Sequence, residues 1–237
     1  MQDIEEQYQQ LGGRFITSID GIKNRLLKAK AFIFDWDGVF NDGSKTANAS
    51  SAFSEVDSMG TNLLRYSHFL RHKNIPITAV ISGEKNDTAF YFSKRECFHY
   101  NFYKAATNKI DALHYICNKE KIKPEQVVYF FDDVLDLSIA EICGLRILVN
   151  QKSNPLFANY CKHHHLADYI TANRGGDFAV REVTELLIGL NDNFEQVISD
   201  RKSAGKEYQH YLEHRRAVNT QFFTFADNMV IAGDVKL

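Results

Sequence analysis

Two acidic residues, Asp35 and Asp37, end a short apolar run and are the first candidates for chemistry in this chain. Residues two apart on an extended chain face the same side, and Gly38 allows the backbone to turn away tightly. Two carboxylates so close repel each other unless a cation lies between them. The pair therefore predicts a cation site, although a polar turn after a strand has the same composition.

Two further features favour a phosphate group near these acids. The apolar run 77–81 is followed by Ser82 and Gly83, which offer a hydroxyl and free backbone N–H groups at the start of a predicted helix. Lys109 stands in the first turn of another predicted helix, where the helix dipole disfavours a cation unless an anion is near. Read singly, these residues are equally an ordinary helix cap and a solvated lysine.

A second group of acids follows the apolar run 127–131 and comprises Asp132, Asp133 and Asp136. Acids are common at helix starts, but three of them facing the first pair across one sheet edge indicate a divalent cation. Oxygen ligands without clustered His or Cys favour Mg²⁺. The combined set of carboxylates, hydroxyl, lysine and Mg²⁺ is typical of phosphoryl transfer through an aspartyl-phosphate.

The elements that position these residues alternate regularly along the chain. Buried strands are predicted at 31–34, 77–81, 98–102, 127–131, 145–149 and 169–171, and helices at 59–72, 84–95, 108–120, near Asp136, at 155–161 and at 176–190. Such alternation predicts an α/β fold in which helices cover both faces of a parallel sheet. The carboxyl ends of parallel strands share one edge, so the polar residues should meet there.

The two ends of the chain are predicted to be extensions of a central domain. Residues 1–30 have an apolar stripe at helical spacing, and residues 191–237 combine charge-rich helical sequence with an aromatic tail. We therefore expect an N-terminal helical extension at 1–30, a catalytic domain at 31–190 and a C-terminal helical tail at 191–237. The sequence leaves open whether this tail packs on its own domain or on a neighbouring subunit.

Composition narrows the class of partner. The 237 residues include 44% hydrophobic and 24% charged residues with a net charge of −2, which gives no reason to expect a nucleic acid or a membrane as partner. A small molecule is the expected partner. Four cysteines without C-x-x-C spacing and the absence of a visible signal peptide or membrane span favour a cytoplasmic protein.

The four motifs together resemble those of the haloacid dehalogenase superfamily: DWDG at 35–38, ISG at 81–83, Lys109 and DDVLD at 132–136. Over roughly 31–189 the chain is more closely similar to the small 3-deoxy-octulosonate 8-phosphate phosphatases, with NDG at 41–43, TNK at 107–109 and GGDFAVREV at 175–183. The resemblance implies a Rossmann-like three-layer fold without a cap domain and with a small flap hairpin within 39–53. It also implies a homotetramer.

The same resemblance implies a role for each motif residue. Asp35 is then the nucleophile and Asp37 the general acid and base, while Ser82, Gly83 and Lys109 hold the phosphate. Mg²⁺ is expected to be bound by Asp35, the backbone carbonyl of Asp37 and Asp132, with Asp133 and Asp136 in support. The implied reaction is Mg²⁺-dependent hydrolysis of a small phosphorylated sugar or sugar acid.

Departures from the family pattern concern the substrate. Glu84 stands where the family usually has Arg, residues 56–58 read Val-Asp-Ser in place of Arg-Asp-Gly, and Phe131 replaces a glycine. Arginines are natural partners of a sugar acid's carboxylate, so their loss argues against the usual octulosonate substrate. By resemblance, Asp57 and Arg174 are candidates for substrate contacts. Two alternatives stay open: a weakly catalytic or non-catalytic oligomerisation module, and an open-site phosphatase acting on a macromolecule.

Overall fold

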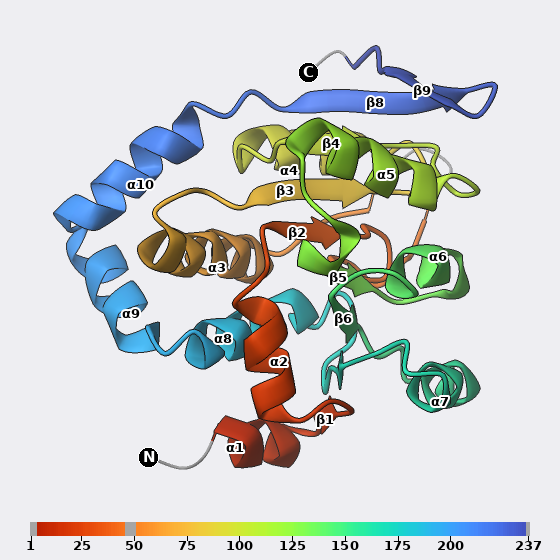
Figure 1. Ribbon diagram of the computed structural model, residues 1–237. Helices are drawn as coiled ribbons and strands as arrows, with labels where there is room; N and C mark the ends of the chain where they lie inside the picture. The colour runs from red at the N-terminus through yellow and green to blue at the C-terminus, as the bar shows by residue number, and fades with distance from the viewer. Residues whose placement is uncertain (1–3, 46–50, 236–237) are drawn as a thin grey trace.

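The computed structural model describes residues 4–45 and 51–235, which form one sheet covered by helices on both faces (Figure 1). In this part of the chain the strand order is β1-β7-β6-β5-β2-β3-β4-β8-β9. Strands β7 to β8 of this order run parallel, and β1 and β9 pair antiparallel at the two edges. The strands are β1 (Arg14–Phe15), β2 (Ala31–Phe34), β3 (Ile77–Ile81), β4 (Tyr100–Phe102), β5 (Val127–Phe131), β6 (Leu145–Leu148), β7 (Tyr169–Ile170), β8 (Gln221–Ala226) and β9 (Met229–Ala232).

The core consists of two clusters, one on each face of the sheet, and each cluster is covered by a layer of helices. Phe32 and Phe34 of β2 pack in the cluster with residues of α2, α3, α4 and α8 to α10, whereas Ala31 and Ile33 pack with residues of α5, α6 and α7. All four residues of β2 are buried because helices cover both faces of the sheet. The helices are α1 (Ile4–Leu11), α2 (Ile19–Leu26), α3 (Glu55–His72), α4 (Asp87–Arg95), α5 (Lys109–Glu120), α6 (Leu137–Ala140), α7 (Pro155–His163), α8 (Ala179–Leu190), α9 (Phe194–Ser203) and α10 (Lys206–Arg216), with 3-10 turns at Pro124–Gln126 and Val134–Asp136. The predicted three-layer α/β fold is confirmed.

The N-terminal segment differs from the continuous helical stretch predicted for 1–30. Helix α1 ends before Gly12, whose φ of +111° is not helical, and the chain then forms β1 against β7. Phe15 therefore lies on a strand, with its ring 4.9 Å from that of Tyr169. Ser18 caps the separate helix α2 by accepting a hydrogen bond from the Gly21 N–H.

The C-terminal segment contains helices, as predicted, but its aromatic part is a β-hairpin. Figure 1 shows α9 and α10 passing from α8 along one side of the molecule to β8. Strand β8 pairs with β4, and the ring of Phe223 stacks 5.2 Å from that of Phe102. Asp227 and Asn228 adopt positive φ between β8 and β9, the conformation that a two-residue hairpin turn needs. The tail thus packs on its own domain, while the boundaries at 30 and 190 stay predictions.

The flap predicted within 39–53 is described only in part. Residues 39–45 and 51–53 form turns and irregular backbone, and 46–50 lie outside the described residues, so the hairpin stays a prediction. Among the helices of the described chain, none has the length and the apolar character needed to cross a bilayer.

Candidate active site

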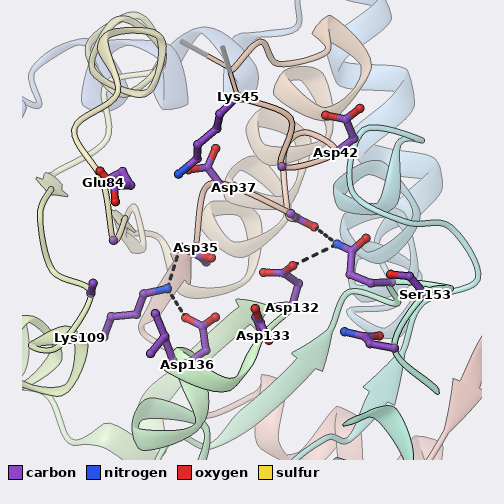
Figure 2. A pocket seen from close by; sticks show the side chains of 17 residues that line it. Asp35, Asp37, Asp42, Lys45, Glu84, Lys109, Asp132, Asp133, Asp136 and Ser153 are labelled. Carbon is purple, nitrogen blue, oxygen red and sulfur yellow. Dashed lines mark hydrogen bonds and ion pairs between the residues drawn. The ribbon is translucent and has the colours of Figure 1, made fainter. Parts of the chain in front are cut away.

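A cavity of about 480 Å³ opens at the carboxyl ends of β2, β3, β5 and β6, where the motif residues were expected to meet (Figure 2). We call it the active-site pocket. The residues that line it are Asp35, Asp37, Gly38, Asp42, Gly43, Lys45, Gly83, Glu84, Ala106, Lys109, Asp132, Asp133, Leu135, Asp136, Gln151, Ser153 and Asn154. The parallel sheet therefore brings together seven of the ten sequence-predicted site residues, whereas Ser82, Asp57 and Arg174 do not line the pocket.

Asp35 and Lys109 form the innermost pair of the pocket. Asp35 directly follows β2, and its backbone N–H donates to the Phe130 carbonyl of β5 over 2.9 Å. Lys109 is the first residue of α5, and its Nζ lies 2.9 Å from Asp35 Oδ1. Burial and the Asp136 charge raise the pKa of Asp35 to about 7, although Lys109 opposes that rise. The pair thus places a carboxylate with little exposure to solvent beside a fixed ammonium group.

Asp136 is the second partner of Lys109 and is fully buried. Its Oδ1 accepts hydrogen bonds from Lys109 Nζ over 2.6 Å and from the hydroxyl of Tyr129. Its Oδ2 has no hydrogen-bond partner among the described residues. Because an unpaired buried carboxylate oxygen is costly, this atom indicates a further positive group at the site.

The acidic cluster of the pocket has the composition and spacing of a cation site. Asp35, Asp132 and Asp136 each offer one carboxylate oxygen, and these oxygens lie within 4.8 Å of one another. Burial and the charges of Asp35 and Asp136 raise the pKa of Asp132 to about 8. A set of oxygen ligands with unbalanced charge fits Mg²⁺. Asp133 also lines the pocket, but it is exposed and accepts from the Val134 N–H as a helix cap.

Asp37 lies at the mouth of the pocket and contacts the described ends of the flap segment. Its Oδ1 accepts from Ser51 Oγ over 2.7 Å, and its Oδ2 lies 3.2 Å from Lys45 Nζ. Trp36, between the two acids, is completely buried and stacks on Phe40, so it packs in the core. Asp37 is thus partly exposed, as a group that exchanges protons with solvent must be.

Ser82 and Gly83 follow β3 at the same edge of the sheet. Ser82 is buried, and its Oγ accepts from the Glu84 N–H over 3.3 Å. The helix predicted from 84 begins only at Asp87, because Asn86 caps α4 by accepting from the Ala89 N–H. Ser82 is therefore not a helix cap. The segment between β3 and α4 instead presents its turn to the pocket.

Close backbone contacts at the pocket require two glycines. A Cβ at Gly38, whose φ is +81°, would lie 1.9 Å from Asp132 Oδ2. A Cβ at Gly175 would lie 2.0 Å from the Gly38 carbonyl oxygen. Gln151 supports the same corner, since its Nε2 donates to the Gly38 carbonyl over 2.7 Å and to Asp132 Oδ2 over 3.1 Å.

Sequence reasoning missed Gln151 and Lys45. Gln151 follows β6 at the edge where β2 and β5 end, so its place after a predicted strand was the only available signal. Lys45 belongs to an irregular segment with no periodic pattern. Lys45 lies near Asp37 because of the path of the backbone, and no sequence motif predicts this contact.

Asp57, predicted to contact the substrate, does not line the active-site pocket, and that contact stays a prediction. Asp57 is fully buried, and its Oδ1 accepts from the Arg181 N–H in the first turn of α8 over 2.8 Å. Its carboxylate thus serves a helix start outside the pocket, and burial raises its pKa to about 6. Arg174 is exposed, pairs with Asp177 over 2.7 Å and does not line the pocket. Its contact with a substrate stays a prediction.

Curated relatives identify the family. The 3-deoxy-D-manno-octulosonate 8-phosphate phosphatase KdsC of Salmonella typhi is 31% identical over 166 residues, which cover 67% of this chain and 79% of the relative. The chain belongs to this phosphatase family. The KdsC of Yersinia pestis is 28% identical over 184 residues, covering 74% of this chain and 88% of that protein. No protein-family model matches the chain.

Solved structures of the family have the same fold. The phosphatase from Moraxella catarrhalis, in complex with magnesium, phosphate and KDO, has a TM-score of 0.64 and 26% identity, and the match covers 77% of this chain and 98% of that one. A probable phosphatase from Pseudomonas syringae has a TM-score of 0.64 and 28% identity, and the match covers 76% of this chain and 96% of that one. The chain therefore shares its fold with these phosphatases. Nearly a quarter of it lies outside the first of these matches.

Proposed function

We propose that this phosphatase hydrolyses the phosphate ester of a small sugar, with Asp35 as nucleophile and Asp37 as general acid and base. The observation that carries this proposal is the placement of Asp35 beside Lys109, with Nζ 2.9 Å from the carboxylate, in a pocket that Asp37 also lines. A carboxylate beside a fixed cation suits attack on a phosphoryl group, because the cation offsets the charge of both reactants.

The reaction then has two steps. In the first, a carboxylate oxygen of Asp35 attacks phosphorus, the bond to the sugar oxygen breaks, and Asp37 protonates that oxygen as it leaves. In the second, Asp37 takes a proton from water, the water oxygen attacks phosphorus, and the bond between phosphorus and Asp35 breaks. The products are the sugar alcohol group and inorganic phosphate, and both acids return to their starting states.

The remaining motif residues position the phosphate. Lys109 neutralises its charge, while the backbone at Gly83 and the hydroxyl of Ser82 offer hydrogen-bond donors at the end of β3. Mg²⁺ would be held by Asp35, Asp132 and the carbonyl of Asp37, with Asp133 and Asp136 in support, and it supplies further charge neutralisation. The cluster of carboxylate oxygens favours a larger share for Asp136 than the family resemblance implies.

The substrate class is a small phosphorylated sugar. The named relatives make 3-deoxy-D-manno-octulosonate 8-phosphate the first compound to test, although Glu84 lines the pocket where a sugar acid would prefer a cation. Membership in a family of phosphatases disfavours both the oligomerisation module and a macromolecular substrate. The homotetramer and the cytoplasmic location stay predictions.

The test is the Asp35→Asn variant, assayed with a panel of sugar phosphates in the presence of Mg²⁺. We expect turnover to fall by about a thousandfold or more, since the amide is a poor nucleophile of nearly the same size. Asp192→Asn, at an exposed acid that pairs with Lys23, is the matched control and should keep wild-type turnover. Wild-type activity in Asp35→Asn would show that the nucleophile is misassigned.

A further inference from the structure

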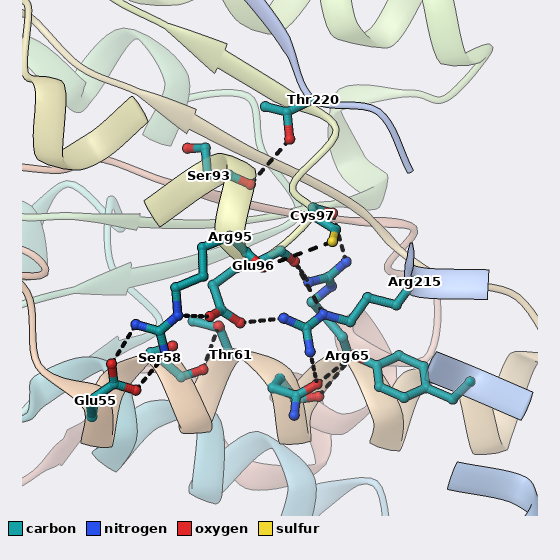
Figure 3. A network of polar contacts seen from close by, with 12 residues as sticks. Glu55, Ser58, Thr61, Arg65, Ser93, Arg95, Glu96, Cys97, Arg215 and Thr220 are labelled. Carbon is teal, nitrogen blue, oxygen red and sulfur yellow. Dashed lines mark hydrogen bonds and ion pairs between the residues drawn. The ribbon is translucent and has the colours of Figure 1, made fainter. Parts of the chain in front are cut away.

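A second cavity, of about 340 Å³, lies between α3, the end of α4 and the tail helices α9 and α10, and it shares no lining residue with the active-site pocket. We call it the arginine pocket. Figure 3 shows part of its polar network, in which side chains of α3 and the end of α4 meet Arg215 of α10. The residues that line it are Glu55, Ser58, Met59, Asn62, Arg95, Glu96, Arg201, Tyr208, Leu212, Arg215 and Arg216.

Both carboxylates of this pocket are already paired. Arg95 binds Glu55 with two hydrogen bonds, one of them Nη2 to Oε2 over 2.5 Å. Glu96 is nearly buried between two arginines, with Arg215 Nη2 at 2.6 Å and Arg95 Nε at 3.3 Å from its carboxylate. Two of the four lining guanidinium groups are thus balanced.

The other two guanidinium groups have no carboxylate partner in the described part of the chain. These belong to Arg201 and Arg216, one on each tail helix. The Nε of Arg201 is buried without a hydrogen-bond partner, and its guanidinium carbon lies 5.2 Å from the centre of the Tyr208 ring. A buried donor without an acceptor indicates a group that the chain itself does not supply.

A fifth cation, which does not line the arginine pocket itself, raises the positive potential in it. Arg65 of α3 is almost completely buried, and its two terminal nitrogens donate to the backbone carbonyls of Glu96 and Cys97. Neutral acceptors therefore hold this guanidinium, and its charge is not offset by a carboxylate of its own. Because the site is partly enclosed, this excess is screened less than on an open surface.

Neutral polar groups complete the cavity. Asn62 donates to the hydroxyl of Tyr208 over 2.8 Å and accepts from that of Tyr211 over 2.9 Å, so its amide has a fixed orientation. The volume lies at the lower end of the range for small-molecule sites. A sugar-sized ligand fits this volume, and a folded protein segment does not.

From this combination we propose that the arginine pocket binds a small phosphorylated molecule at a site separate from the active site. A dianionic phosphate matches the two unbalanced guanidinium groups in charge, and arginine forks bind phosphate oxygens in a bidentate manner. The neutral groups of Asn62 and Ser58 suit the hydroxyls of its organic part. Such a ligand ties the tail helices to α3 and α4.

Glucose 6-phosphate is the probe for the test, titrated calorimetrically into the full-length protein in EDTA so that no turnover occurs. We expect the Arg201→Gln, Arg216→Gln double variant to bind it about tenfold more weakly or worse, since charge-assisted hydrogen bonds are lost. Lys202→Gln with Lys206→Gln removes the same charge from the same two helices outside the pocket, and it should keep the affinity within about twofold. Unphosphorylated glucose should not bind at this site.

Two results would overturn the proposal. One is unchanged affinity in the arginine double variant, and the other is an equal loss in the lysine double variant, which would indicate unspecific attraction. If the arginine double variant fails to fold, Arg216→Gln alone decides, since this side chain is exposed and lies outside the buried core. Asp35→Asn should retain the binding, so loss of the proposed catalytic function leaves this test intact.

Discussion

Seven carboxylates and two lysines line the active-site pocket, whereas four guanidinium groups and two carboxylates line the arginine pocket. In the first, part of the excess charge sits on short aspartate side chains at the buried end of the pocket, and the pKa values of Asp35 and Asp132 rise as a result. In the second, the excess sits on long arginine side chains whose charge is delocalised and weakly hydrated. The difference teaches that the first cavity demands a cation for stability, while the second only favours an anion.

The two pockets also differ in construction. Strand ends build the active-site pocket, so its residues stand at predictable places in short motifs. The arginine pocket joins helices from distant parts of the chain, as in the pair of Glu96 with Arg215. Its tail helices belong to the C-terminal segment that the family resemblance over 31–189 does not include. The second pocket is thus an addition to a fold whose first pocket follows the family pattern.

Among the variants that test this comparison, the largest expected effect comes from a change in the active-site pocket that alters no charge. Gly38→Ala places a Cβ 1.9 Å from Asp132 Oδ2, and we expect kcat/KM to fall by about a hundredfold because the acidic cluster must shift. Gly12→Ala is the matched control: its φ of +111° is also positive, but the nearest atom is 3.5 Å away and the residue lies outside the pocket. That variant should lose about 1 kcal/mol of stability and keep its activity. Equal kinetic losses in both variants would contradict the role of the Asp132 contact.

A second prediction concerns pH and metal. The pKa values of Asp35, about 7, and Asp132, about 8, exceed the unfolded value of about 3.9, so the folded protein binds more protons. Without metal, stability should therefore fall as pH rises towards 8, by about 2 kcal/mol between pH 6.5 and 8.5. Mg²⁺ should restore most of the lost stability, because the cation takes the place of the bound protons. The gain from Mg²⁺ should be larger at pH 8.5 than at pH 6.5.

Thermal unfolding in EDTA and in Mg²⁺ at the two pH values measures this effect. The buried His68 and His99, whose pKa values burial lowers to about 3, act in the opposite direction. Their unfolded pKa of about 6.5 lies at the lower end of the chosen window, so there they offset only part of the effect of the two aspartates. Asp132→Asn should flatten the pH dependence in EDTA. An apo protein that gains stability from pH 6.5 to 8.5 would refute the charge excess of the active-site pocket.

The smallest expected effect concerns the arginine pocket. Glu55→Gln releases Arg95 from its exposed ion pair, so the stability should change by less than about 1 kcal/mol. Affinity for glucose 6-phosphate in EDTA should rise by about threefold, because the two terminal nitrogens of Arg95 become available. The kcat/KM for sugar phosphates should stay at the wild-type value. A weaker affinity in Glu55→Gln would count against the arginine pocket as an anion site.

The active site was largely predictable because its geometry follows from local rules. A buried strand that ends in acids, and parallel strands whose carboxyl ends share an edge, suffice to bring Asp35, Lys109 and Asp132 together. Asp57 shows where this reasoning fails. The family resemblance made it a candidate for substrate contact, but its position in the first turn of α3 directs its carboxylate to the start of α8. Only the packing of two helices decides such a contact.

The ends of the chain depended more strongly on context. The aromatic tail around Phe223 has residues that suit a strand, yet only the open edge of β4 makes it one. The segment 1–30 has apolar residues at helical spacing. Phe15 nevertheless pairs in the sheet, because the edge of β7 that does not contact β6 is open to it. Sheet edges are formed by residues far away in the sequence, and no local pattern reveals them.

By itself, the sequence determined the alternation of strands and helices, the phosphatase motifs and the oxygen-only set of ligands, because each depends on periodicity or on neighbouring residues. The tertiary structure alone decided that Gln151 and Lys45 join the pocket, that Asp57 caps a helix, and that the tail continues the sheet. It also created the arginine pocket. The physical reason is the same in each case: these contacts join segments whose separation along the chain carries no signal until the core has packed.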